Sequence, residues 1–401
     1  MVPSSNGLEE MFPLRNSPEH YLQLLKQERP EWYQDAISLV QHIAITGIPF
    51  LENKEFQEIK STVPASLYEF YNSFVTPHKN KIYLRGKRYY ISISDIAVDS
   101  EMALEQLKEN INRIVPLMPT IFDLCDKSRN IQERLFLGLP LDHLKHYLLN
   151  IFTAVYNTMR EKEEVSAEYL QSSVDLVQQR ISEYYKFIIT GQTPTKSIDQ
   201  AVLDSIASQI DSQVSFTSPK SLLREFDHPG RIILYSTHLL KEIAEKGEHY
   251  HLALNPLTGS AEIGETVRTF SDLLNKRVID DVEYIRYSTK DEQHPEVINL
   301  IDLLHLAVPR QLHESFKKRI KGRNILVIDD NLGRGKTLST IRKNLAELAM
   351  KVDITVAEIS SLPIDPEKTR LTEKDLDYPP IGLWRNQKYI LEDIRNLLWG
   401  R

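Results

Sequence analysis

Apolar residues recur every three or four positions through most of residues 18–190, the spacing of amphipathic helices. One stretch differs, because residues 81–93 are rich in tyrosine and isoleucine on both sides of Arg85-Gly86-Lys87-Arg88, which predicts a β-hairpin. The first half is therefore predicted to be mainly helical. Its clearest stripes are Leu104, Leu107, Ile111 and Ile114; Leu144, Leu148, Ile151 and Val155; and Leu170, Val174, Val177, Ile181 and Tyr184, with Ser166 as a plausible N-cap.

After Ile189 the pattern changes to short apolar runs that alternate with helical stretches. Such alternation predicts βαβ units around a largely parallel sheet. We expect a helical domain at 1–190, a linker at 191–229 and an α/β domain at 230–401. The expected strands are 232–235, 250–254, 282–287, 325–328 and 352–359, and the expected helices are 236–246, 264–275, 296–319 and 337–350.

Composition narrows the class of protein. The 401 residues are 41% hydrophobic and 26% charged, which is typical of globular proteins. A net charge of −7 argues against nucleic-acid binding over the whole surface. Cys125 is the only cysteine, so an internal disulfide and a cysteine-based zinc site are excluded. With no signal-peptide pattern and no long apolar run, we expect a cytoplasmic protein without a membrane span.

The segment from Asn324 to Leu338 carries the clearest chemistry. A short apolar strand is expected to end in Asp329-Asp330, followed by a loop with two glycines and a helix starting near Thr337. Glycines turn backbone N–H groups toward an anion, and the helix N-terminus adds partial positive charge. Paired carboxylates suit hydroxyl donors such as those of a ribose. A Walker A loop is excluded, because it needs glycine where this chain has Asp330.

This segment resembles the phosphoribosyl-pyrophosphate (PRPP) signature of type I phosphoribosyltransferases, nearest to the hypoxanthine-guanine branch. Upstream, Leu252–Ser260 resembles the strand and pyrophosphate loop of that family, and 282–290 resembles the strand leading to its catalytic flap. The resemblance implies an α/β phosphoribosyltransferase fold. It also implies roles for these residues: Asp329 and Asp330 on the ribose; Gly333, Arg334, Gly335, Lys336 and Thr337 around the 5′-phosphate; Leu257, Thr258, Gly259 and Ser260 on pyrophosphate; and Arg286 and Lys290 in the flap. Trp384 offers a stacking face for the base, and the alternative for it is packing in the core.

The implied reaction is attack of a nitrogen nucleophile on C1′ of PRPP with release of pyrophosphate, assisted by Mg²⁺ held mainly through PRPP. Three departures argue against ordinary purine salvage. Gly333 replaces the aspartate that faces the base, Thr258 replaces a lysine, and 357–361 lacks the purine-recognition lysine. The alternative is a PRPP- or nucleotide-sensing regulator without turnover, and a third option is an effector that uses the first half for recognition.

The first half carries no chemical signature of its own. The basic residues Arg85, Lys87 and Arg88 lie beside tyrosines, a pattern that favours a solvated hairpin tip over a nucleic-acid binding site. A metal site at His143 and His146 is not expected, because no third ligand is evident. We expect a homo-oligomer that takes PRPP and a small-molecule acceptor. A protein or nucleic-acid partner through the first half stays open.

Overall fold

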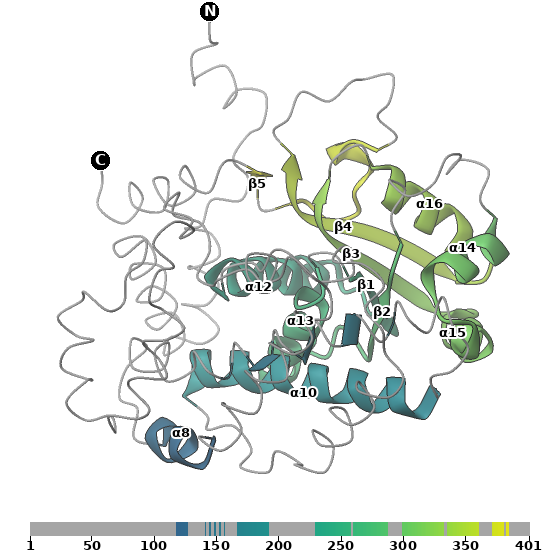
Figure 1. Ribbon diagram of the computed structural model, residues 1–401. Coiled ribbons are helices and arrows are strands. Elements are labelled where there is room, and N and C mark those ends of the chain that lie inside the picture. Colours follow the sequence, from purple (N-terminus) through teal and green to yellow (C-terminus); the bar gives the residue numbers. More distant parts are fainter. Residues whose placement is uncertain are drawn as a thin grey trace, which may run out of the picture.

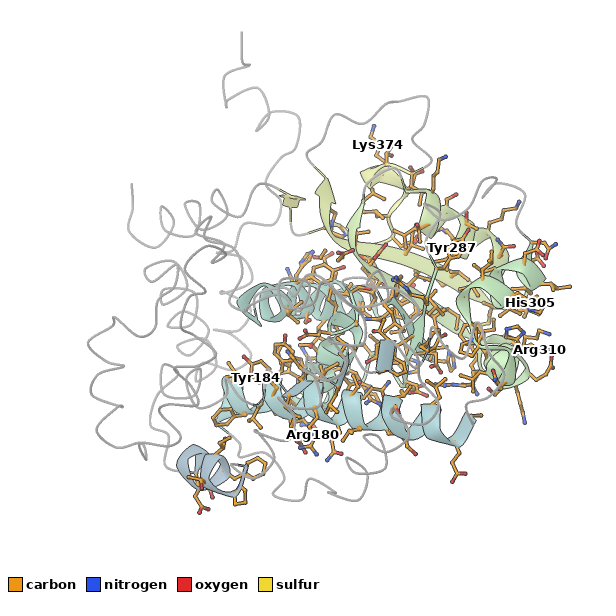
Figure 2. The ribbon with its side chains drawn as sticks, in the orientation of Figure 1. Arg180, Tyr184, Tyr287, His305, Arg310 and Lys374 are labelled. Carbon is orange, nitrogen blue, oxygen red and sulfur yellow. The ribbon has the colours of Figure 1, made fainter. Side chains whose placement is uncertain are left out.

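The computed structural model describes residues 118–126, scattered positions from 141 to 156, 167–191, 229–257, 260–287, 299–332, 335–360, 371–380 and 382–384. Figure 1 shows a central sheet flanked by helices, and Figure 2 shows side chains filling the space between them. In the described part of the chain, no helix is long and apolar enough to cross a membrane.

The sheet has five strands in the order β2-β1-β3-β4-β5, and every neighbouring pair is parallel. Parallel strands must be joined by crossovers, and α-helices form those between β1 and β2, β2 and β3, and β3 and β4. The predicted α/β class is therefore confirmed for this half of the chain. The strands are β1 (Leu252–Pro256), β2 (Val282–Ile285), β3 (Asn324–Leu332), β4 (Lys351–Ser360) and β5 (Gly382–Trp384).

Helices cover both faces of the sheet (Figure 1). Alternate strand residues such as Leu254, Val327 and Ile354 pack in one apolar core with α14, α15 and α16. On the other face, α12 reaches the sheet where the Tyr235 hydroxyl lies 3.1 Å from that of Thr355, and α10 packs outside α13. The helices are α8 (Met118–Cys125), α10 (Ala167–Thr190), α12 (Pro229–Lys246), α13 (Ile263–Leu273), α14 (Leu300–Ala307), α15 (His313–Ile320) and α16 (Lys336–Leu345), with 3₁₀ turns η5 (Arg310–Leu312) and η7 (Glu373–Asp375).

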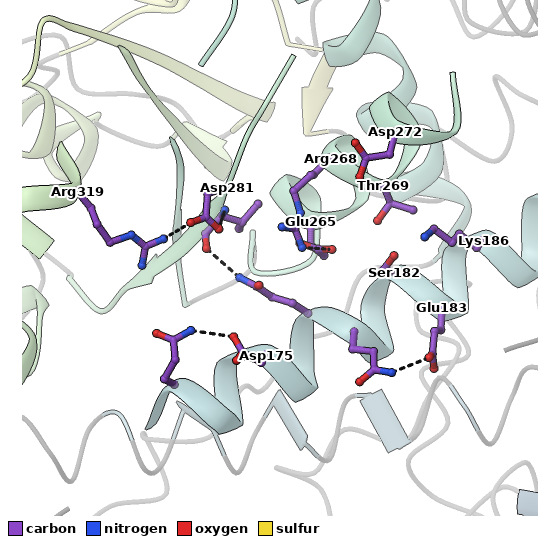
Figure 3. Close-up of a pocket in the computed structure, with 14 residues that line it drawn as sticks. Asp175, Ser182, Glu183, Lys186, Glu265, Arg268, Thr269, Asp272, Asp281 and Arg319 are labelled. Carbon is purple, nitrogen blue, oxygen red and sulfur yellow. Dashed lines mark hydrogen bonds and ion pairs between the residues drawn. The ribbon is translucent and has the colours of Figure 1, made fainter. Parts of the chain in front are cut away.

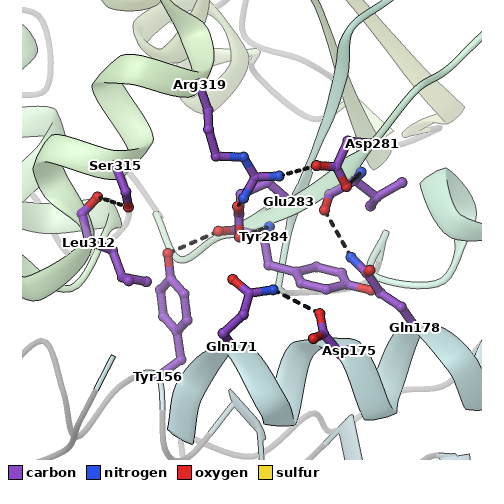
Figure 4. A network of polar contacts seen from close by, with 11 residues as sticks. Tyr156, Gln171, Asp175, Gln178, Asp281, Glu283, Tyr284, Leu312, Ser315 and Arg319 are labelled. Atoms are coloured by element: carbon purple, nitrogen blue, oxygen red, sulfur yellow. Dashed lines mark hydrogen bonds and ion pairs between the residues drawn. The ribbon is translucent and has the colours of Figure 1, made fainter. Parts of the chain in front are cut away.

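The outer edge of β2 is closed by side chains from the first half of the chain (Figure 4). β2 is an edge strand, and the carbonyls of Val282 and Tyr284 point away from β1. Gln178 on α10 donates its amide to the Val282 carbonyl at 2.8 Å, and the Tyr156 hydroxyl donates to the Tyr284 carbonyl at 2.9 Å. Buried carbonyls need such partners. The helices of the first half thus complete the sheet.

Four strand predictions are confirmed, and one is wrong. Residues 232–235 lie in α12, which begins at Pro229, a residue favoured at the first position of a helix. Residues 232–235 on their own have the composition of a strand. The helical spacing becomes visible only when the buried positions Leu239 and Ile243 are included. The sequence pattern also gives no indication of β5.

The helix expected over 296–319 is interrupted. α14 ends at Ala307, and Pro309 precedes η5, because proline cannot donate the N–H that a continuing helix needs. The helices expected near 264–275 and 337–350 are confirmed as α13 and α16. The stripe from Leu170 to Tyr184 is confirmed as the buried face of α10.

Several predictions lie outside the described residues. These are the stripe at 104–114, the hairpin at 81–93 with its basic tip, and the positions of His143 and His146. Leu144 and Leu148 are helical and buried, whereas Ile151 and Val155 lie outside the description. The domain boundaries at 190 and 230 stay a prediction.

Replacing Tyr156 by Phe tests how much the edge closure stabilises the protein. The Tyr156 hydroxyl is buried between the carbonyls of Tyr284 and Ala307, at 2.9 and 3.0 Å. Its removal leaves buried carbonyls without this donor, so the free energy of unfolding should fall by about 1–3 kcal/mol in urea titrations. Ser315→Ala, which removes an exposed hydroxyl bonded to the Leu312 carbonyl, is the control and should cost less. Equal losses would contradict the assigned role.

Candidate functional site

The strand order places a reversal of direction at the centre of the sheet. The chain passes from β1 outward to β2, and then returns to β3 on the other side of β1. In open α/β sheets, ligands bind at the carboxyl ends of the strands beside such a switch point. β1 and β3 are neighbouring parallel strands, so their carboxyl ends lie at the same end of the sheet. The two strongest motifs, 257–260 and 329–337, follow β1 and span the end of β3.

The acid pair lies inside β3, not after its end. β3 was expected to end at Ile328, but it pairs with β4 as far as Leu332, opposite Ile359. Asp329 is buried, Asp330 is half-buried, and the Asp330 N–H donates to Asp329 Oδ1 at 3.0 Å. Burial, followed by repulsion from Asp330, raises the pKa of Asp329 well above its usual value. The charged form of Asp329 is therefore disfavoured in the folded protein.

Gly335 sets the start of α16. It is the N-cap residue in the left-handed conformation, with φ +67°, and α16 begins at Lys336, one residue before the predicted start. A Cβ on Gly335 would lie 2.5 Å from Leu371 Cβ and 2.9 Å from the Leu371 backbone nitrogen. Both the conformation and the close approach require glycine. Lys336 and Thr337 are half-buried in the first turn, and Gly333 and Arg334 lie outside the described residues.

The turn after β1 is held by its own side chains. Leu257 is buried and its N–H donates to the Ile285 carbonyl of β2. The Ser260 hydroxyl donates to the Pro256 carbonyl at 2.9 Å, so it supports the turn. Asn255 donates its amide to the Ser260 carbonyl at 2.6 Å. Thr258 and Gly259 lie outside the described residues.

The remaining predicted site residues are Arg286, Lys290 and Trp384. Arg286 follows β2, half-buried, with its N–H donated to the Ala307 carbonyl. Lys290 lies outside the described residues. Trp384 is the last residue of β5, and its side chain is outside the description, so the base-facing role stays a prediction.

Sequence reasoning missed Asn255 and Glu262, which shape the turn between β1 and α13. Asn255 had a signal, because it is a polar residue in an otherwise apolar strand. Its side chain is fully buried against Gly264, where a Cβ would lie 2.4 Å from Asn255 Oδ1. Glu262 had none, because its partners are distant in the sequence.

A histidine-aspartate cluster lies at the amino ends of β1 and β2, at the end of the sheet opposite the acid pair. Donor atoms of His249, His251 and Asp280 lie within 4.8 Å of one another. However, His251 Nδ1 already accepts the Asn324 N–H at 3.2 Å, and the Arg277 Nε lies 3.1 Å from Asp280. A neutral imidazole that accepts at Nδ1 carries its proton on Nε2, which opposes metal binding there. The cluster as it stands is a hydrogen-bonded ion-pair network.

A polar cavity of about 770 Å³ lies between α10, α13 and the start of β2, away from the acid pair (Figure 3). Glu265 on α13 lines it and pairs with Arg268 at 2.8 Å. Burial outweighs this pairing and raises the pKa of Glu265 to about 7. Burial likewise raises the pKa of Glu283 on β2 to about 7, although Arg319 contacts it. Both carboxyls therefore favour the protonated form more strongly in the folded than in the unfolded protein.

Gly335→Ala tests the close approach at the start of α16. Gly322 has the same φ of +67°, but a Cβ added there would meet nothing within 4 Å, so Gly322→Ala is a matched control. We expect Gly322→Ala to lower the free energy of unfolding by about 1 kcal/mol, the cost of the left-handed conformation. Gly335→Ala should cost about 2–4 kcal/mol, because Leu371 must also move. Chemical denaturation measures both, and equal costs would reject the packing argument.

The buried carboxyls predict a pH dependence of stability. A group whose pKa is raised on folding stabilises the protein below its unfolded value, near 4.5, and loses that contribution as pH rises through about 7. The free energy of unfolding should therefore fall between pH 5 and 7, by up to about 1.4 kcal/mol per pH unit for each group. Glu265→Gln should make the slope shallower in urea titrations at several pH values.

Glu314→Gln is the control for that slope. Glu314 is fully exposed, and its hydrogen bond to Lys317 lowers its pKa, so it titrates below this range. Stability that does not change with pH in the wild type, or an unchanged slope in Glu265→Gln, would contradict the prediction.

Comparison with protein-family models gives no match, and comparison with curated proteins gives none. Among solved structures, the chain is similar to three described as an analysis of an invariant aspartic acid in HPRTs, as the alanine, glutamine and glutamic acid mutants. Each is 16% identical and covers 39% of this chain and 76% of its own, with TM-scores of 0.27, 0.26 and 0.27. The function of this chain therefore rests on the residues of its own site.

Proposed function

We propose that the chain is a PRPP-dependent phosphoribosyltransferase that transfers the 5-phosphoribosyl group to a nitrogen nucleophile and releases pyrophosphate. The observation that carries this proposal is the position of Asp329-Asp330, at the carboxyl end of the central strand β3 and just before Gly335 and α16. The resemblance of this segment to the PRPP signature supplies the ligand, and the switch point between β1 and β3 supports a ligand site there.

The acid pair suits the ribose hydroxyls. A hydroxyl donates to a carboxylate, and such charge-assisted bonds contribute about 1.5–3 kcal/mol each. In the free protein, burial and mutual repulsion raise the pKa of Asp329. Donors from the ribose would relieve both costs, so the acid pair favours a ligand that brings hydroxyl groups.

The start of α16 suits the 5′-phosphate. Gly335 makes no side-chain capping hydrogen bond at the start of α16, and the first N–H groups of a helix have no partner within the helix. A phosphate gains from these donors and from the helix dipole. The turn 257–260, across from β3 on the neighbouring strand, would then take the pyrophosphate group.

Magnesium fits the donor set at this edge. Carboxylate oxygens are ligands that Mg²⁺ prefers, and a cation would offset the repulsion between Asp329 and Asp330. When bound with PRPP, Mg²⁺ would neutralise the charge of the leaving pyrophosphate. Of the two carboxylates, Asp330 is the less buried, so it is the one better suited to contact Mg²⁺.

The reaction forms a bond from the nucleophile nitrogen to C1′ while the bond from C1′ to the pyrophosphate oxygen breaks. Pyrophosphate leaves with the bonding electron pair, and the nitrogen loses its proton to water or to phosphate oxygen. Gly333 provides no side chain to accept that proton. The chain would act by positioning and electrostatics.

Gly333 also favours the second candidate function, a PRPP- or nucleotide-sensing protein that binds the same ligand without turnover. The two functions share the site and differ in pyrophosphate release. The first half would then serve to contact a partner.

Titration calorimetry with PRPP and Mg²⁺ tests the shared site. We expect binding by the wild type, and a loss of affinity of about 10–100-fold in Asp330→Asn, because the amide is a weaker hydroxyl acceptor. Glu314→Gln removes an exposed acid on α15 and should bind as the wild type does. No binding by the wild type, or equal binding by all three proteins, would reject the proposed site.

Turnover separates the two functions. The wild type is incubated with PRPP, Mg²⁺ and a metabolite extract, and mass spectrometry looks for a ribosyl-5-phosphate product together with released pyrophosphate. Product formation that is lost in Asp330→Asn supports the transferase. Binding without any product in the extract supports the sensor.

A further inference from the structure

The turn that joins β1 to α13 ends in a rigid set of hydrogen bonds around Glu262. Glu262 is the N-cap residue of α13, and its carbonyl accepts the Thr266 N–H at 3.0 Å and the Thr266 hydroxyl at 2.7 Å. Two residues before Glu262, the Ser260 carbonyl accepts hydrogen bonds from the Ile263 N–H and from the Asn255 side-chain amide. Ser260, the last residue of the turn, is therefore tied through Ile263 to the start of α13, where Glu262 lies.

The side chain of Glu262 does not cap its own helix. It turns away, is only 5% exposed, and contacts two residues from the first half of the chain. Lys145 Nζ lies 2.5 Å from Glu262 Oε2, and the Tyr185 hydroxyl donates to the same oxygen at 2.6 Å. The Lys145 ammonium also lies 4.5 and 4.9 Å from the ring centres of Tyr184 and Tyr185.

Burial of Lys145 and Glu262 fixes where their side chains meet. Lys145 is fully buried, so separating its ammonium from the Glu262 carboxylate would cost the attraction between two charges in the interior. The two tyrosine rings confine the ammonium from the sides. Glu262 is therefore held at one point in space by groups that lie 77 and 117 residues away in the sequence.

We propose that Glu262 is a positioning residue, through which Lys145 and Tyr185 of the first half fix the turn 257–260 for pyrophosphate. This inference rests on the proposed function. The turn has Thr258 where a lysine would supply charge, so its affinity depends on how well its backbone N–H groups are aimed. The first half of the chain thereby contributes to ligand binding without touching the ligand.

The double variant Lys145→Met/Glu262→Gln tests the proposal. It removes both charges with little change in size and keeps an acceptor for Tyr185, whereas a single substitution would leave the other charge buried without its counterpart. Calorimetry should show pyrophosphate with Mg²⁺ binding at least fivefold more weakly than in the wild type. Ribose 5-phosphate, which lacks pyrophosphate, should bind within twofold of the wild type.

Hydrogen exchange gives a second measurement that needs no ligand. Amides in the peptide 256–263 should exchange at least tenfold faster in the double variant, while those of β3 keep their wild-type rates. The control is Lys317→Met/Glu314→Gln, which removes an exposed lysine–glutamate pair of similar length, 2.8 Å. It should change neither binding nor exchange at 256–263.

The outcomes separate the two claims. If the wild type binds neither pyrophosphate nor ribose 5-phosphate, the proposed function fails, and this inference fails with it. If the wild type binds both and the double variant binds both equally well, only the positioning role is rejected. Equal weakening for both ligands, with faster exchange throughout the sheet, would mean that the cluster serves stability alone, and would also reject it.

Discussion

The outward-facing carbonyls of edge strand β2 are the constraint on which the rest of the structure depends. A parallel sheet of this order leaves one side of β2 without a neighbouring strand, and buried carbonyls without donors are costly. Gln178 and Tyr156 supply those donors from α10 and from the helical residues that precede it. β1 lies between the supported edge strand β2 and the central strand β3, so the carboxyl ends of β1 and β3 lie side by side.

That arrangement places two carboxyl groups beside each other at the carboxyl end of β3, where their charged forms are disfavoured. Asp329 and Asp330 lie next to each other at the carboxyl end of β3, and Asp329 is buried. Elsewhere in the domain, Glu265 on α13 and Glu283 on β2 are buried beside arginines, and burial still raises the pKa of both. For these three acids, desolvation by burial therefore affects the pKa more than neighbouring charges do.

The sequence predicted the features that depend on near neighbours. Four strands, the buried stripe of α10 and the start of α16 within one residue all follow from periodicity and glycine. The failures have physical causes. Residues 232–235 form a helix because Pro229 and the later apolar positions outweigh a short β-rich run. β3 continues through Asp329 because pairing with β4 outweighs the cost of placing an acidic residue in a buried strand. The pairs Lys145–Glu262 and Tyr156–Tyr284 join residues more than 100 positions apart, beyond the reach of any local pattern.

The Lys145–Glu262 pair also has a consequence for biosynthesis. Lys145 leaves the ribosome 117 residues before Glu262, and at about 5–20 residues per second this is a delay of roughly 6–23 seconds. During that time Glu262 is not yet there to meet the ammonium, and burial of the charge between Tyr184 and Tyr185 would be unfavourable. The buried environment of Lys145 can therefore form only after Glu262 has been synthesised.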